Sequence, residues 1–324
     1  MKKKVLSMIL VLVLSVSMLA ACGQKDDAAT EGETTTSSES TESSEKTYTI
    51  GAVMKDNSDT FVKNIADAMV ARADELGVEL IMMDAVGDVN KQIELTENLI
   101  TQGVDAIILN AMDMDGSVPC ITKAKEAGIP IVVCNTDVNS DEYDAFVGAD
   151  DVESGEIQSG YVLENLEEGA SVCIIQGPMG QAAQVGRMAG YEKAGILTTY
   201  NVLAEQTANW KREEALALSE DWITTYGDEL KAIICQNDDM AMGALAAVKA
   251  TGRTDIMVVG IDAIEDALVA VESGELACTV FQDSAGQGSV GVETALALAK
   301  GETVEPDIRI PFILVTQDNV AEFK

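Results

Sequence analysis

The chain has 324 residues and a formal net charge of −34, with 23% charged and 47% hydrophobic residues. This acidity argues against nucleic acid and anionic lipid headgroups as partners, because both select proteins with basic patches. The chain contains no histidine, which excludes His-based catalytic triads and disfavours a catalytic zinc site. We expect neither a metal nor a cofactor.

The N-terminus has the pattern of an export signal. Lysines at positions 2–4 precede an apolar run over residues 5–19 and the small pair Ala20-Ala21, which predicts a signal peptide over residues 1–21. The stretch Leu19-Ala20-Ala21-Cys22 also resembles the lipobox of bacterial lipoproteins. The resemblance implies that Cys22 is acylated and anchors an exported chain to the outer face of the cell membrane. An ordinary cleaved signal or an uncleaved membrane anchor are the alternatives.

Residues 23–46 contain no aromatic and no large aliphatic side chain. Such a segment cannot bury enough apolar surface to offset the entropy of ordering it. We therefore expect residues 22–46 to form a lipidated cysteine followed by a disordered Ser/Thr/Glu-rich linker. A spacer of this length suits a Gram-positive cell wall.

Six cysteines are present, and those other than Cys22 show no CxxC spacing. Four of them, Cys134, Cys173, Cys235 and Cys278, lie in or beside apolar strand-like runs, where cysteine behaves as a small hydrophobic residue. Scattered positions of this kind argue against a disulfide framework.

From residue 47 onward, short apolar runs alternate with amphipathic stretches. Most of the runs are continuous and rich in β-branched residues, as in strands buried on both faces. The expected strands are residues 49–54, 78–83, 106–109, 130–134, 145–147, 171–175, 201–204, 232–235, 256–259, 277–281 and 309–315. Gly77, Gly103 and Gly252 follow helical stretches and are expected to end them.

This alternation predicts an α/β fold with doubly wound parallel sheets. About eleven strands would make an unusually large single sheet, so we expect two lobes, with a candidate boundary around residues 147–151.

Polar side chains follow the expected strands, at the sheet edge where ligands of open α/β folds bind. They are amides and carboxylates, whereas lysine and glycine-rich phosphate loops do not recur in these positions. The candidates are Asn110, Asn135, Asp151, Asn237, Asp262 and Gln282. Each Asp is alternatively a helix N-cap. Together they favour an uncharged polyhydroxylated ligand, because a carboxylate or amide can pair with vicinal hydroxyls.

Three further side chains fit such a ligand. Arg187 supplies five donors in a planar fork, and Trp210 and Phe61 can pack on the C–H faces of a sugar ring.

The stretch Gln236-Asn-Asp-Asp-Met-Ala-Met-Gly-Ala-Leu, followed by Val258-Val-Gly-Ile-Asp262, resembles the ribose-binding-type sugar-binding proteins of ABC importers. This periplasmic binding protein type I resemblance covers the body from Thr49 to about Val315. It implies two Rossmann-like lobes joined by a three-strand hinge, with the ligand in the cleft. The N-terminal lobe would be residues 47–149 and 284–310, and the C-terminal lobe residues 150–283 and 311–324.

By position, the resemblance implies sugar contacts from a set that overlaps the strand-end candidates: Asn110, Asn135, Asp151, Arg187, Trp210, Asn237, Asp262 and Gln282. The first loop departs from the family, because only Phe61 remains of its usual aromatic pair. Asn135 replaces a common aspartate, and Asp151 stands where ribose binders carry asparagine. A hexose, a pentose or an inositol is therefore expected.

These observations predict a monomeric, extracellular binding lipoprotein that delivers a sugar or polyol to the permease of an ABC importer. Presentation of the ligand to a membrane receptor is the main alternative, and a nucleoside or autoinducer ligand is another. An enzyme is disfavoured, because no activated nucleophile or metal cluster is evident.

Overall fold

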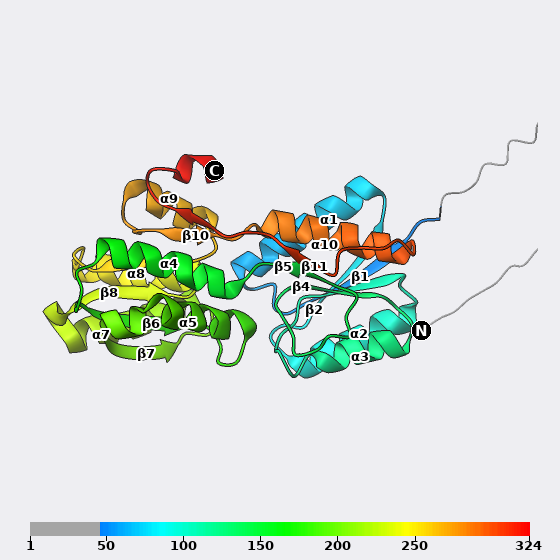
Figure 1. Ribbon diagram of the computed structural model, residues 1–324, viewed down its shortest axis with the longest axis horizontal. Coiled ribbons are helices and arrows are strands. Elements are labelled where there is room, and N and C mark those ends of the chain that lie inside the picture. Colours follow the sequence, from blue (N-terminus) through cyan, green and yellow to red (C-terminus); the bar gives the residue numbers. More distant parts are fainter. Residues whose placement is uncertain (1–45) are drawn as a thin grey trace, which may run out of the picture. The chain divides into compact units, whose positions relative to one another are not determined.

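The computed structural model describes residues 46–324, which form one compact unit. The expected signal peptide, Cys22 and the linker up to residue 45 lie outside the described residues. Strands and helices alternate along the chain, and the expected α/β fold with two Rossmann-like lobes is confirmed (Figure 1). In the described part of the chain, no helix has the length and apolar character needed to cross a membrane.

The first lobe is built on a six-stranded sheet in the order β11-β5-β4-β3-β1-β2, and all of its pairings are parallel. Its strands are β1 Thr49–Met54, β2 Glu79–Asp84, β3 Ala106–Leu109, β4 Ile131–Asn135, β5 Ala145–Gly148 and β11 Asp307–Arg309. Helices cover both faces of the sheet, so its central strands are buried, as their continuous apolar runs predict.

Two helices lie on each face of this sheet. Helices α1 Thr60–Leu76 and α10 Ser284–Ala299 share one apolar core with the sheet, and α2 Val89–Gln102 and α3 Val118–Glu126 share the other. Asp59 begins α1 by accepting a hydrogen bond from the Val62 amide, and Gly77 ends it in the left-handed conformation. Gly103 ends α2, and Gly252 ends α8 Asp238–Thr251, in the same way, as expected.

The second lobe contains a parallel four-stranded sheet in the order β7-β6-β8-β9. Its strands are β6 Ser171–Gln176, β7 Asn201–Thr207, β8 Leu230–Cys235 and β9 Met257–Val259. Two isolated parallel bridges, at Val259–Cys278 and Asp262–Phe281, link this sheet to the strand pair β10 Thr279–Phe281 and β12 Ile313–Val315.

Helices also cover both faces of the second sheet. One face carries α7 Arg212–Tyr226, α8 Asp238–Thr251 and α9 Glu265–Ser273, and the other carries α4 Asp151–Asn165, α5 Ala182–Ala194 and α6 Ile196–Thr199. Two short 3-10 helices, at Gly227–Glu229 and Val320–Phe323, complete the described chain.

The chain passes from one sheet to the other three times. The crossings lie between β5 and α4, between β10 and α10, and between β11 and β12. A small apolar cluster of Ala149, Ile261, Val280 and Phe312 packs beside them.

One sequence prediction about the last crossing is wrong. Residues 309–315 do not form one strand, because β11 and β12 belong to different sheets and Pro311, which has no amide hydrogen, separates them. The two main sheets are parallel, as expected, and a separate two-stranded sheet pairs β10 with β12 in the antiparallel direction.

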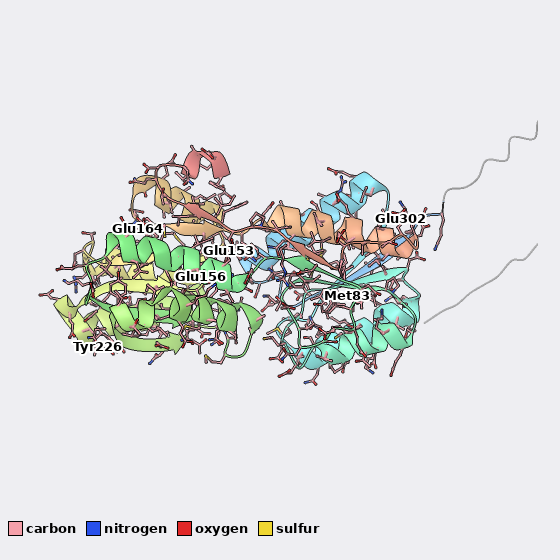
Figure 2. All side chains as sticks on the ribbon, in the orientation of Figure 1. Met83, Glu153, Glu156, Glu164, Tyr226 and Glu302 are labelled. Carbon is pink, nitrogen blue, oxygen red and sulfur yellow. The ribbon has the colours of Figure 1, made fainter. Side chains whose placement is uncertain are left out.

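The cysteines and the surface acids behave as the sequence suggests. Cys120, Cys134, Cys173, Cys235 and Cys278 are buried and free. Many glutamates, among them Glu153, Glu164 and Glu302, are exposed, which agrees with a solubilising role for the negative charge (Figure 2).

Helices α4 and α5 approach each other closely because glycines meet at their crossing. A Cβ atom on Gly155 would lie 2.4 Å from the carbonyl oxygen of Arg187, and one on Gly190 would lie 2.4 Å from that of Val152. A Cβ atom on Gly186 would similarly lie 2.6 Å from the Cβ atom of Asp151. These glycines set the distance between the helices that carry Asp151 and Arg187.

We expect Gly155→Ala to lower the free energy of unfolding by about 1–3 kcal/mol, because the added methyl group overpacks the helix crossing. Gly160, on the same helix, has no atom within 4 Å of its would-be Cβ. Gly160→Ala should therefore stabilise the protein by about 0.5–1 kcal/mol through helix propensity alone. Urea denaturation of both variants checks this, and equal stabilisation by the two alanines would contradict the close contact.

Candidate functional site

A cavity lies at the carboxyl ends of strands from both sheets. It is lined by thirteen residues: Lys55, Asp59, Phe61, Val62, Asn135, Thr136, Asp151, Ala183, Arg187, Trp210, Asn237, Asp262 and Gln282. Eight of the nine side chains selected from the sequence are among them. Asn110 is the exception.

This inner cavity has a volume of about 30 Å³ and adjoins an outer cavity of about 610 Å³. Lys55, Asp59 and Trp210 line both. The inner space is about the size of one water molecule. A monosaccharide therefore fits among the inner side chains only if the walls of the cavity move apart.

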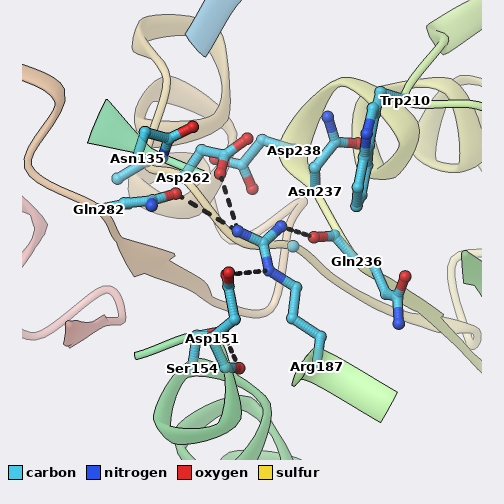
Figure 3. A network of polar contacts seen from close by, with 12 residues as sticks. Asn135, Asp151, Ser154, Arg187, Trp210, Gln236, Asn237, Asp238, Asp262 and Gln282 are labelled. Carbon is cyan, nitrogen blue, oxygen red and sulfur yellow. Dashed lines mark hydrogen bonds and ion pairs between the residues drawn. The ribbon is translucent and has the colours of Figure 1, made fainter. Parts of the chain in front are cut away.

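Arg187, on α5, is the centre of the polar network of the second lobe (Figure 3). One terminal nitrogen, Nη1, donates a hydrogen bond to the carbonyl oxygen of Gln236, and Nη2 donates to Gln282 Oε1 at 3.3 Å. The side chain is only 4% exposed, so its charge is largely removed from water.

Two carboxylates flank this guanidinium. Asp151 Oδ1 lies 3.3 Å from Arg187 Nε, and Asp262 Oδ1 lies 3.8 Å from Nη2. Asp151 Oδ1 and Arg187 Nε are both buried, and within this ion pair they face each other without a well-formed hydrogen bond. Burial raises the pKa of both carboxyls, and the positive charge of Arg187 opposes that rise.

Trp210 lies on the loop between β7 and α7 with a positive φ of 63°. Its indole nitrogen donates to Gln181 Oε1 at 2.7 Å, and its ring centroid lies 5.6 Å from the Arg187 guanidinium carbon. The ring occupies the space above Gly177, where a Cβ atom would lie 2.0 Å from it. Gly177 thus allows the aromatic wall to form.

Asn237 has two functions at once. Its side-chain oxygen caps α8 by accepting a hydrogen bond from the Met240 amide. Its side chain still lines the cavity, where the amide NH₂ group remains as a donor.

In the first lobe, Asn135 ends β4 with a φ of 69° and donates to Gln287 Oε1 at 3.0 Å. Asn110 follows β3 and donates to Asn135 Oδ1 at 3.2 Å, while its own side-chain oxygen accepts from the Lys55 amide at 3.3 Å. Asn110 therefore lies behind the wall and supports two residues that line the cavity.

The sequence reasoning missed Lys55, Asp59 and Thr136. Lys55 directly follows β1, so the strand-end rule applied to the first strand would have found it. Its ammonium group donates to Thr136 Oγ1 at 3.3 Å, and burial lowers its pKa. Within the described part of the chain, Lys55 is the one lysine that lines the inner cavity, among amides and carboxylates that recur there as expected.

Among residues 46–324, no group of three or more Cys, Asp or Glu side chains is placed to hold a metal ion. The cavity instead offers three carboxylates, two cations, several amides and two aromatic rings. Such a set can pair with many hydroxyl groups from several directions.

The sequence from residue 50 to residue 303 matches the periplasmic binding protein domain. The chain belongs to this family. The resemblance to ribose-binding-type proteins is also confirmed, since the chain is 32% identical to the ribose import binding protein of Escherichia coli, over 83% of this chain and 90% of the relative.

Other relatives of this periplasmic binding protein carry different names. It is 40% identical to a putative rhizopine-binding protein of Rhizobium meliloti, over 85% of this chain and 92% of the relative. It is 35% identical to a xylitol-binding protein of Mycolicibacterium smegmatis, over 93% of this chain and 82% of the relative. Among solved structures, an ABC transporter solute-binding protein from Bacillus halodurans with bound myo-inositol is 36% identical, with a TM-score of 0.81 over 85% and 96% of the two chains.

We expect the free energy of unfolding to decrease as the pH rises from about 4 towards 7, because buried acids with a raised pKa hold protons longer in the folded state. Asp59, Asp151 and Asp262 all have a pKa raised by burial. Asp262→Asn should make this decrease shallower. Urea denaturation at a series of pH values measures the slope.

Asp255 provides a matched control, because its partner Arg253 lowers its pKa to about 2. Above about pH 5 this carboxyl is ionised in both the folded and the unfolded states, so Asp255→Asn should leave the slope between about pH 5 and pH 7 unchanged. An identical slope in the wild-type protein and in Asp262→Asn would contradict the assignment of Asp262 as a proton-holding group.

Proposed function

We propose that this protein is the extracellular solute-binding lipoprotein of an ABC importer and captures a neutral polyol, either a monosaccharide or a cyclitol. The observation that carries the proposal is the convergence of Asp151, Asp262, Arg187 and Trp210 on one cavity at the ends of parallel strands. Relatives named for ribose and xylitol, and a related structure with bound myo-inositol, support the ligand class.

In this proposal each side chain of the cavity has a distinct role. Asp151 and Asp262 accept hydrogen bonds from ligand hydroxyls, and Arg187 donates to ligand oxygens. Trp210 and Phe61 pack against the C–H faces of the ligand.

The amides and Lys55 complete the set of donors. Asn237 and Gln282 contribute from the second lobe, and Asn135 from the first. Lys55 adds a second cationic donor from the first lobe. Asn110 acts indirectly, by orienting Asn135 and the backbone of Lys55.

Binding is coupled to movement at the three crossings between the sheets. The inner cavity is too small for a sugar, so the walls separate to admit the ligand and close on it. A ligand that contacts residues of both lobes favours the closed arrangement to the extent that it binds that arrangement more tightly. The closed form is the species that the permease recognises.

The donors and acceptors also define what the site rejects. Three carboxylates line the inner cavity against two cations, and Arg187 is already paired with two of these carboxylates. An anionic sugar would bring a further negative charge into a desolvated site. The proposed ligand is therefore uncharged.

Titration calorimetry of the purified protein against myo-inositol, xylitol, ribose, allose and glucuronate tests the ligand class. At least one neutral polyol should bind, and glucuronate should not. Asp262→Asn should weaken binding of that polyol by about 1–3 kcal/mol, because one buried carboxylate oxygen that accepts hydrogen bonds is replaced by an NH₂ donor. Asp255→Asn, at a surface ion pair, is the matched control and should bind normally.

Two results would count against the proposal. One is failure of every neutral polyol to bind, and the other is unchanged affinity in Asp262→Asn.

The anchor is tested separately. Cys22→Ala should release the protein from the membrane fraction into the medium, because the acylated thiol is the proposed attachment. Polyol affinity should stay at the wild-type value, since all the residues of the proposed site lie within the unit Lys46–Lys324. Retention of the variant in washed membranes would contradict the lipid anchor.

A further inference from the structure

A carboxylate with no contact to either cavity is buried beside the site. Asp238, the first residue of α8, is 0% exposed and is absent from the lining of the inner and outer cavities. Figure 3 shows it beside Asp262. Burial of a carboxylate is costly unless hydrogen bonds compensate for the lost hydration.

The hydrogen bonds of Asp238 all come from the two segments that hold Asp262. Thr279 Oγ1, on β10, lies 2.8 Å from Asp238 Oδ1 and 2.9 Å from Oδ2. The Ile264 amide donates to Oδ2 at 3.1 Å. The Thr279 hydroxyl in turn accepts from the Ala263 amide at 3.2 Å, so one threonine joins the carboxylate to the turn.

The backbone around this carboxylate is shaped to admit it. Gly260 ends the segment before the turn, and a Cβ atom there would lie 2.0 Å from Asp238 Oδ1. No side chain fits at position 260 while Asp238 occupies its present place. The carboxylate is thus a built-in part of the turn that follows β9.

The turn itself is strained. Asp262 has a φ of 132° and the next residue, Ala263, has a φ of 59°, although neither is glycine. Such conformations cost about 1–3 kcal/mol each and persist only when surrounding contacts determine them. The amides of Ala263 and Ile264 are held by Thr279 and Asp238, and the Asp262 amide donates to the Val280 carbonyl at 2.8 Å.

We propose that Asp238 and Thr279 are positioning residues of the ligand site, which hold the strained turn so that the Asp262 carboxylate faces the ligand. The inference rests on the proposed function, because Asp262 is a ligand residue only in that proposal. Asp238 itself touches no ligand. It acts through the backbone of residues 263 and 264.

If Asp238 holds the turn, ligand affinity should depend on pH, because Asp238 can be protonated. Burial raises the pKa of Asp238 to about 7. The titratable groups around Asp238 are Asp239 on the same helix, Asp262 on the turn, and the thiols of Cys235 and Cys278. Arg187 on α5 and Asp59 before α1 act on Asp262 as well. Below pH 7 a protonated Asp238 accepts the donors of the turn less well, so ligand affinity should fall as the pH decreases from 8 to 6.

The test compares four variants by titration calorimetry, using the neutral polyol that the wild-type protein binds. Thr279→Val removes the hydroxyl with little change of shape, and Thr279→Ser restores it. Asp238→Asn removes the charge. Glu265→Gln removes an exposed charge from the start of α9 and is the matched control. Thermal unfolding of each variant monitors folding.

We expect Asp238→Asn and Thr279→Val to weaken binding by about tenfold at pH 8, as for a lost buried hydrogen-bond network, while Thr279→Ser and Glu265→Gln stay within about twofold of wild type. The fall in affinity from pH 8 to pH 6 should be present in the wild-type protein and in Glu265→Gln, and reduced in Asp238→Asn. A purely structural role would weaken Asp238→Asn by the same factor at every pH.

Two outcomes overturn the inference. One is affinity within about twofold of wild type for both Asp238→Asn and Thr279→Val, since a positioning network must change affinity when it is cut. The other is equal loss in Thr279→Ser and Thr279→Val. Failure of the proposed function looks different, because the wild-type protein itself would then bind no polyol.

Discussion

The guanidinium of Arg187 is removed from water, and its surroundings determine how the second lobe is assembled. Its partners come from the end of β8, the start of α4, the turn after β9 and the segment after β10. A cation in such a place is tolerated only if every partner is in position, because each missing acceptor leaves desolvated charge uncompensated. The ends of these segments are therefore constrained by one side chain, and the same constraint leaves acceptors beside the cavity.

The backbone geometry around Arg187 follows from small residues rather than from charge. Gly155, Gly186 and Gly190 bring α4 and α5 together, and Gly177 and Gly260 make room for Trp210 and Asp238. Non-glycine residues with positive φ also gather here, among them Asn135, Trp210 and Asp262. Close approach and local strain thus occur at the same positions as the chemistry, as is usual where a binding site must be preorganised.

Much of this arrangement could be predicted from the sequence, because continuous β-branched runs and strand-end polar residues are local signals. They located the strands and the side chains of the inner cavity that follow them. Other features depend on tertiary contacts. The split of residues 309–315 arises from sheet membership, and the support role of Asn110 arises from a contact with Asn135 across two strands. The residues with positive φ in the turn are Asp262 and Ala263, and neither is a glycine that would have indicated this conformation in the sequence. The proposed role of Asp238 depends on a hydrogen bond from Thr279, which lies 41 residues away.

Two of the three crossings between the sheets themselves carry cavity residues. Asp151 stands at the first crossing and Gln282 at the second. A ligand contact at a crossing lies close to the axis of the proposed lobe movement. Such a contact restrains the backbone torsion angles of the crossing directly and opposes rotation of the lobes only weakly. Phe61, at the start of α1, and Trp210, before α7, belong to the lobes rather than to the crossings, so contact with them restrains the lobes themselves. In the proposed binding mode, a single small molecule thus contacts both the crossings and the lobes that they join.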